Sequence, residues 1–140
     1  MDKTLTLRNK IEDVGLLPTF VEEICQELEL ASDKAFNLNL ALEEAVTNIV
    51  SYAFPQGEEH EFMLHASSDG QRLVFRLEDD GVPFDPTAVA DADTTLSAEE
   101  RPIGGLGIFL IRQIMTDVRY AYADGRNQLT MTLELNKNNS

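Results

Sequence analysis

Glu44 and Asn48 place a carboxylate and an amide four residues apart in the stretch EEAVTN, residues 43–48. Side chains with this spacing share one face of a helix, so the two are expected to lie side by side. An amide oxygen can coordinate Mg²⁺, which takes most of its other ligands from substrate phosphates and water. A nearby carboxylate can orient or deprotonate an attacking hydroxyl. Such a pair is more often a solvated helix face. Glu43 points about 100° away and is expected at the surface.

A second candidate group lies in the stretch DDGVPF, residues 79–84, directly after a segment with strand periodicity. Asp79 stands at the strand end, where a carboxylate can accept a hydrogen bond from the exocyclic amine of a base. Gly81 has no side chain and lets a flat ring approach the main chain. An ordinary Asp-Gly turn explains the same residues, so this stretch alone favours a turn.

The third stretch is GGLGI, residues 104–108, which opens a segment of helical and apolar character. Glycines at a helix start leave main-chain N–H groups free, and with the helix dipole they form an anion site. No Gly-Lys-Ser/Thr follows, and the βαβ setting is absent. The stretch is therefore neither a Walker loop nor a dinucleotide fingerprint.

Two kinds of periodicity describe the elements that must position these groups. Helical spacing runs to about Leu30, then through a second segment that Ser32 or Asp33 can cap and that Pro55 and Gly57 end. A third helical segment covers 108–115. Period-two alternation predicts strands at 4–8, 62–67, 72–77, 118–122 and 129–135, with hairpin turns at Asp69-Gly70 and Asp124-Gly125.

The strands each have one apolar and one polar face, which is typical of a sheet solvated on one side. We therefore expect an α/β two-layer sandwich, with a mixed, mostly antiparallel sheet covered on one face by about three helices. The length of 140 residues predicts a single domain, 1–140. The long polar segment at about 82–104 is interpreted as a lid over a site.

The formal net charge of -14 disfavours direct contact with nucleic acid or anionic membranes. Protein partners are therefore expected. No apolar run approaches the roughly 18 residues of a membrane helix. Cys25 is the single cysteine, which excludes an internal disulfide. A cytoplasmic protein is the simplest interpretation.

The order and separation of the three stretches resemble the Bergerat-type ATP-binding fold, which histidine kinases, gyrase and a group of serine kinases share. The stretch LEEAVTN, residues 42–48, looks most like the anti-sigma-factor serine-protein kinases, as do the short length and the N-terminal strand and helix. The resemblance covers nearly the whole chain. Two departures are Tyr52 in the run YAF, where the family often has histidine, and Pro83, where it often has glycine.

The resemblance implies a role for each candidate residue. Asn48 would coordinate Mg²⁺, Glu44 would be the catalytic carboxylate, and Asp79 would bind the adenine amino group. Gly81 would let the base sit close. The phosphates would be held at the start of the third helix by Gly105, Leu106, Gly107 and Ile108. Arg101, at the end of the lid, would make a further contact to the terminal phosphate.

The function expected from this resemblance is an ATP-dependent protein-serine kinase of the anti-sigma-factor type. It would phosphorylate a STAS-type antagonist (an anti-anti-sigma factor), bind a sigma factor or similar regulator, and form a homodimer. The alternative is a nucleotide-gated protein-binding module with little or no phosphotransfer. A detached catalytic domain of a histidine kinase is disfavoured, because neither His60 nor His65 lies on a helical hairpin. A globular domain without a ligand is the least favoured interpretation.

Overall fold

The computed structural model describes residues 1–55, 57–88 and 105–135. The order of elements follows the sequence periodicity, with a 3-10 turn before the first helix and another after the third strand. The elements are β1 (Asp2–Arg8), η1 (Ile11–Leu16), α1 (Leu17–Leu28), α2 (Ser32–Tyr52), β2 (Glu61–Ser68), β3 (Arg72–Asp79), η2 (Pro86–Ala88), α3 (Gly105–Ile114), β4 (Asp117–Ala123) and β5 (Arg126–Glu134).

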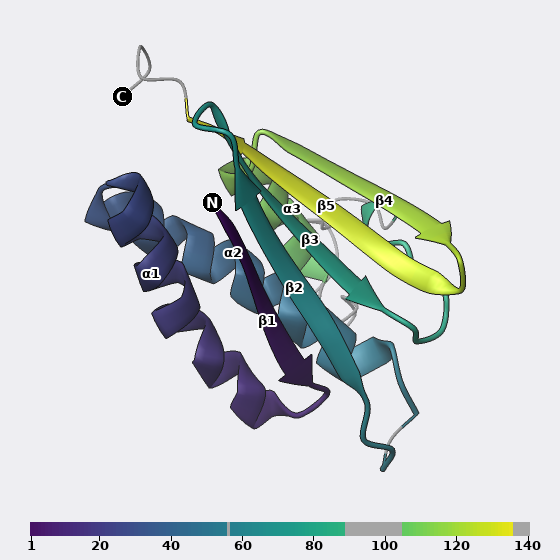
Figure 1. The fold of residues 1–140 in the computed structure, drawn as a ribbon. Coiled ribbons are helices and arrows are strands. Elements are labelled where there is room, and N and C mark those ends of the chain that lie inside the picture. Colours follow the sequence, from purple (N-terminus) through teal and green to yellow (C-terminus); the bar gives the residue numbers. More distant parts are fainter. Residues whose placement is uncertain (56, 89–104, 136–140) are drawn as a thin grey trace.

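The strands form one sheet in the order β1-β2-β3-β5-β4, as Figure 1 shows. Each neighbouring pair in the described sheet is antiparallel. The hairpin between β4 and β5 turns at Asp124 and Gly125, whose φ angles of 57° and 74° are typical of a two-residue primed turn. The register of β3 and β5 sets Asp79 opposite Asn127. This pairing brings two polar residues together at the end of the sheet.

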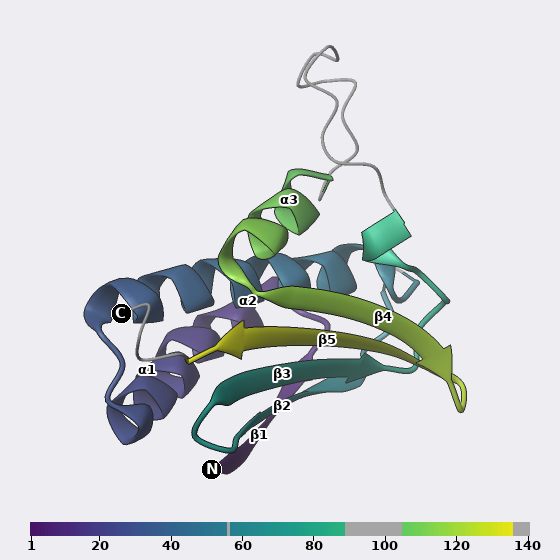
Figure 2. The same cartoon turned by 90° about the horizontal axis from the view of Figure 1, so that it is seen from above.

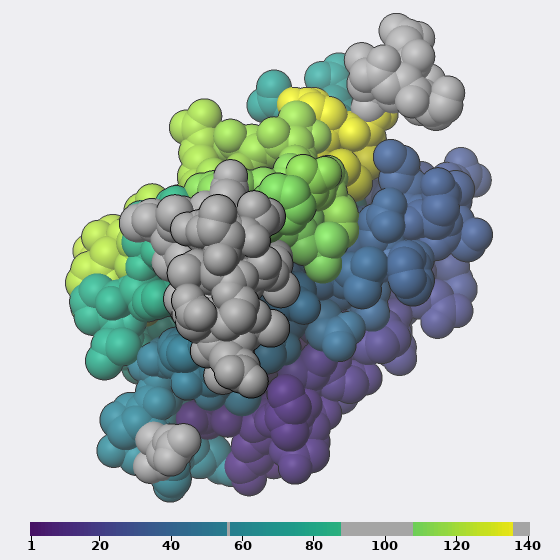
Figure 3. All heavy atoms as spheres, turned by 180° about the vertical axis from the view of Figure 1, so that it is seen from behind, coloured from purple at the N-terminus to yellow at the C-terminus, as the bar shows by residue number. Residues whose placement is uncertain are grey.

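Helices α1, α2 and α3 cover one face of the sheet, and the other face is open (Figure 2). Seen from the helical side, α2 lies between α1 and α3 (Figure 3). The predicted two-layer sandwich is confirmed. Its core lies between the layers and includes Leu7, Leu64, Phe75, Leu77 and Met131 of the sheet and Leu38, Leu42, Val46 and Ile111 of the helices.

The helix boundaries differ from the sequence expectation at the start of α2. The residue in the cap position is Ala31, with extended φ and ψ of -68° and 157°, and no side chain caps the helix. Ser32 and Asp33 lie inside the first turn, so the predicted cap is wrong. Asp33 still places a negative charge at the positive end of the helix dipole. No helix in the described ranges is both long and apolar enough to cross a membrane.

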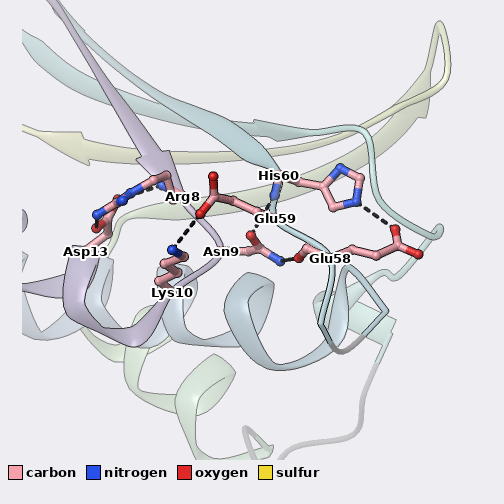
Figure 4. A network of polar contacts seen from close by, with 7 residues as sticks. All are labelled: Arg8, Asn9, Lys10, Asp13, Glu58, Glu59 and His60. Carbon is pink, nitrogen blue, oxygen red and sulfur yellow. Dashed lines mark hydrogen bonds and ion pairs between the residues drawn. The ribbon is translucent and has the colours of Figure 1, made fainter.

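A polar network ties the end of β1 to the start of β2 (Figure 4). Asp13 accepts hydrogen bonds from the guanidinium of Arg8 at 2.8 and 3.1 Å, and these bonds hold the pKa of its carboxyl below the usual range. Asn9 accepts the main-chain N–H of His60 at 2.7 Å. Lys10 pairs with Glu59 at 2.5 Å. The network fixes the turn that leads from the sheet into the first helical layer.

Candidate nucleotide site

Asp79 is the buried carboxylate at the end of β3, with 5% of its surface exposed. Its Oδ1 accepts the main-chain N–H of Gly81 and the side-chain amide of Asn127, both at 2.9 Å. Burial raises the pKa of the Asp79 carboxyl, and these two hydrogen bonds offset part of that rise. No described residue donates a hydrogen bond to its Oδ2. That oxygen therefore remains an acceptor for a ligand.

Asn48 and Glu44 lie on the same face of α2, as their spacing predicted. Asn48 is 9% exposed and lines a pocket together with Asp79. No described residue hydrogen-bonds to its side-chain amide, so both amide atoms are available to a ligand. Glu44 is half-buried one turn earlier in the helix and does not line this pocket. The structure thus brings Asn48 and Asp79 together in one pocket, and Glu44 is not among the residues that line it.

The pocket that Asn48 and Asp79 share has mainly apolar walls, which come from α2, β3, β4, β5 and the segment after β3. Its lining residues are Ala45, Asn48, Ile49, Ala53, Leu77, Asp79, Phe84, Pro86, Tyr120, Asn127 and Leu129. An apolar pocket with a few convergent polar groups is the usual form of a small-molecule site. A flat base with one amine donor fits this chemistry.

Gly81 lies against the last turn of α2. A side chain there would bring its Cβ to 2.2 Å from the main-chain oxygen of Ala53. The same oxygen accepts the N–H of Val82 at 2.9 Å. The close approach that requires glycine is therefore made to a helix end within the protein. Contact of Gly81 with a base stays a prediction.

Asn127 is a site residue that the motif analysis missed. Its amide nitrogen donates to Asp79 and, at 2.9 Å, to the carbonyl of Val82. Its oxygen accepts the N–H of Phe84 at 3.1 Å and the hydroxyl of Tyr120. A signal was present, because Asn127 occupies the core-facing row of its strand, where a polar residue needs partners.

Phe84 and Tyr52 form the second feature that the motifs did not reveal. Their rings stack with centroids 5.8 Å apart and an interplanar angle of 26°. Tyr52 departs from the family pattern, and its ring packs on Phe84 of the segment that follows Gly81. Phe84 lines the pocket, so the stack fixes one of its walls.

The glycine-rich stretch begins α3, which starts at Gly105, three residues earlier than the periodicity predicted. The N–H groups of a first helical turn lack partners within the helix and can bind an anion. Ile108 is buried and packs in the core, so only its main chain can serve a ligand. Arg112 of α3 donates to the carbonyl of Thr87 at 2.7 Å, which links α3 to η2. Arg101 and most of the expected lid, 82–104, lie outside the described residues.

A family model described as the histidine kinase-like ATPase domain matches residues 7–133. The match spans most of the chain, and the chain therefore belongs to the histidine kinase-like ATPase family. The expected fold and the suspected family are both confirmed.

Relatives that are named protein kinases show which group within this family the chain resembles. The serine-protein kinase RsbW of Listeria monocytogenes is 32% identical over 138 residues, 96% of this chain and 87% of that one. The serine/threonine-protein kinase BtrW of Bordetella bronchiseptica is 33% identical over 97 residues, 69% of this chain and 68% of that one. Within the ATPase family, the chain belongs with the RsbW-type serine-protein kinases.

Solved structures agree on the fold. The RsbU and RsbW domains of Rv1364c from Mycobacterium tuberculosis superpose with a TM-score of 0.66 at 13% identity, over 95% of this chain. This chain spans 32% of that longer protein. The SiaB–SiaC complex from Pseudomonas aeruginosa gives a TM-score of 0.58 at 12% identity, over 95% of this chain and 89% of that one. At such identities the likeness supports the fold alone.

Proposed function

We propose that this chain binds ATP with Mg²⁺ and transfers the terminal phosphoryl group to a serine of a partner protein. The observation that carries the proposal is the meeting of Asp79 and Asn48 at one apolar pocket, in a chain that belongs with the RsbW-type kinases. The names of the relatives support the reaction class, and the apolar pocket with its convergent polar groups supports this location for the nucleotide base.

In this proposal Asp79 recognises the adenine base of ATP. Its Oδ2 accepts a hydrogen bond from the exocyclic amine of adenine, while Gly81 and Asn127 hold Oδ1. The apolar side chains of Ile49 and Leu129 remove the ring from water. A base with a carbonyl in place of the amine would leave the buried carboxylate facing an acceptor, so adenine is preferred over guanine.

Asn48 holds the metal ion through its amide oxygen. In the described ranges no group of three or more His, Cys, Asp or Glu residues could bind a metal by itself. A single amide oxygen from Asn48 fits Mg²⁺, because this ion uses few protein ligands and completes its coordination shell with phosphate oxygens and water. When bound, the ion neutralises charge on the phosphates. The N–H groups at the start of α3 hold the phosphate oxygens, with Arg101 as a further contact.

Glu44 acts on the serine. Its carboxylate accepts the proton of the serine hydroxyl as the serine oxygen forms a bond to the terminal phosphorus. The bond between that phosphorus and the bridging oxygen breaks, and its electron pair leaves with ADP. Glu44 then releases the proton to solvent, from its half-buried position on α2.

The partners in this proposal are a STAS-type antagonist, as the serine substrate, and a sigma factor or similar regulator that the kinase binds. The chain works as a homodimer in the cytoplasm, where such regulators act. The net charge of -14 supports control of transcription through proteins, without direct contact with nucleic acid.

Calorimetric titration of ATP with Mg²⁺ tests the nucleotide site. Binding in the range of about 1–100 µM is expected for the wild type, with at least about tenfold weaker binding in Asp79→Asn and in Asn48→Ala. Glu43→Ala serves as the control, because Glu43 is an exposed neighbour on the same helix. A folded wild-type protein that binds no ATP at millimolar concentration would sink the proposal.

Glu44→Ala separates the kinase from the nucleotide-gated binding module. For a kinase, transfer of labelled phosphate to the purified STAS-type protein of the same organism falls by about 100-fold or more, and ATP binding is retained. If the wild type binds ATP and never transfers phosphate, the chain is a binding module.

A further inference from the structure

Tyr52 continues a stripe of candidate residues along α2. Glu44, Asn48 and Tyr52 follow one another at intervals of four residues, which places their side chains on one face of the helix. In the proposed function Glu44 acts on the serine and Asn48 holds the metal ion. The end of α2 lies beside the segment that follows β3 (Figure 2). The stripe therefore ends next to the pocket wall that Phe84 forms.

Phe84 is a wall residue whose main chain and side chain are held by different groups. Its N–H donates to Asn127 Oδ1 at 3.1 Å. Two residues earlier, the N–H of Val82 donates to the carbonyl of Ala53 at 2.9 Å. These bonds fix the path of the chain, but the orientation of the phenyl ring depends on its own χ angles. The ring belongs to a residue that is 36% exposed, so burial alone does not hold it.

The ring of Tyr52 supplies the constraint on this side chain. It stacks on the Phe84 ring with centroids 5.8 Å apart and an interplanar angle of 26°. This separation lies within the range of favourable aromatic pairs. Tyr52 is not among the residues that line the pocket, so its effect on a ligand has to pass through Phe84.

An ordered wall lowers the cost of binding a flat base. A side chain that is free to change rotamer must be ordered when the ligand arrives, and this ordering reduces the affinity. Ile49 and Leu129 line the same pocket from a helix and a strand, whereas Phe84 comes from the segment between β3 and η2. Phe84 therefore depends on support from outside the pocket.

We propose that Tyr52 is a positioning residue for the nucleotide base, which holds Phe84 by stacking in the orientation that receives adenine. The inference rests on the proposed function, because it requires that the pocket takes the base of ATP. It gives a use to a residue that departs from the family pattern, where histidine often stands. The aromatic ring carries the role, so phenylalanine at this position should also support it.

Calorimetric titration of the full chain with ATP and Mg²⁺ tests this role. Tyr52→Ala should bind ATP about 3- to 10-fold more weakly than the wild type, because the stack and the order that it gives Phe84 are lost. ADP should weaken by the same factor, since the effect lies at the base. Tyr52→Phe keeps the ring and should bind ATP within about twofold of the wild type.

Phe54→Ala is the matched control. Phe54 lies two residues beyond Tyr52, and its ring stacks on His60 with centroids 4.4 Å apart. The variant loses a comparable aromatic stack, but Phe54 does not line the pocket or contact its wall through Phe84. Its affinity for ATP should therefore equal that of the wild type. Circular dichroism checks the fold of each variant, and Tyr52→Gln, a good helix former without a ring, repeats the test if Tyr52→Ala folds poorly.

A double variant shows whether Tyr52 acts through Phe84. Phe84→Ala alone should weaken ATP binding at least as much as Tyr52→Ala does. Adding Tyr52→Ala to Phe84→Ala should then cause no further loss, because the wall is already removed. A general structural effect of Tyr52 would instead give losses that add.

Equal ATP affinity in the wild type and in Tyr52→Ala would overturn the inference and leave the proposed function intact. A loss for ATP without a loss for ADP would also overturn it, since Tyr52 would then act at the terminal phosphate. So would an equal loss in Tyr52→Phe, which would assign the role to the hydroxyl, or an equal loss in Phe54→Ala. A folded wild type that binds no ATP refutes the proposed function itself.

Discussion

Asn127 connects three parts of the pocket wall: the buried carboxylate of Asp79, the main chain at Val82 and Phe84, and the hydroxyl of Tyr120. All the hydrogen-bonding capacity of its amide oxygen and nitrogen is directed at these groups. A buried network of this kind is costly to interrupt, because each orphaned partner loses solvation without replacement.

Asn127→Ala is expected to lower the free energy of unfolding by about 1–3 kcal/mol, because it leaves Asp79 and the Val82 carbonyl short of a donor. It should also weaken ATP binding. Urea unfolding and calorimetry measure the two effects. Gln128→Ala, one position along on the open face of the sheet, is the control and should change neither. An Asn127→Ala protein with wild-type stability would refute this role.

The raised pKa of Asp79 has a consequence for stability. Because the folded protein holds the Asp79 proton more tightly than the unfolded chain, stability that this group contributes at low pH is lost as pH rises through the folded pKa. Asp79→Asn should therefore be at least as stable as the wild type at about pH 7, with the advantage shrinking toward about pH 4. Urea unfolding at both values tests this. Lower stability of the variant at neutral pH would contradict it.

At the scale of elements, the site depends on how closely the loop after β3 approaches the end of α2. The Val82 N–H bonds the Ala53 carbonyl, and Gly81 leaves no room for a side chain between them. Asn48 and Asp79 come from these two elements, so the spacing of helix and strand sets the width of the pocket.

Gly81→Ala is expected to destabilise the protein by about 1–3 kcal/mol and to weaken ATP binding, because the new methyl group would press on the main chain of Ala53. Gly15→Ala is the matched control. Its Cβ would meet nothing within 4 Å, and its φ lies outside the range that favours glycine. Urea unfolding of both variants gives the comparison. Equal stability would show that the loop moves aside at no cost.

For the whole molecule, the net charge of -14 opposes the compact state through self-repulsion. Sodium chloride should therefore raise the melting temperature by a few degrees between about 10 mM and 500 mM, as the Debye length shrinks. Potassium chloride should act equally, because screening depends on ionic strength. A melting temperature that falls with either salt would mean that attractive ion pairs, such as Lys10 with Glu59, outweigh the repulsion.

The elements and the fold class were predictable because they follow from local patterns. Alternation of apolar and polar residues predicted the strands, and Asp124-Gly125 predicted a hairpin turn. Pro55 predicted that α2 ends before it, and the helix ends at Tyr52. The start of α2 was less predictable. Ser32 and Asp33 are good capping types, yet Ser32 is already the first residue of the helix, and Ala31 occupies the cap position without a side-chain cap bond.

By itself, the sequence determined the chemistry available: an Asn one turn beyond a Glu, an Asp after a strand, and glycines at a helix start. The tertiary structure decided which of these groups meet. Antiparallel pairing of β3 and β5 set Asn127 against Asp79, and the packing of α2 on the sheet added Asn48. No local pattern carries that information, because residues 48, 79 and 127 become neighbours only when helix and sheet pack into a common core.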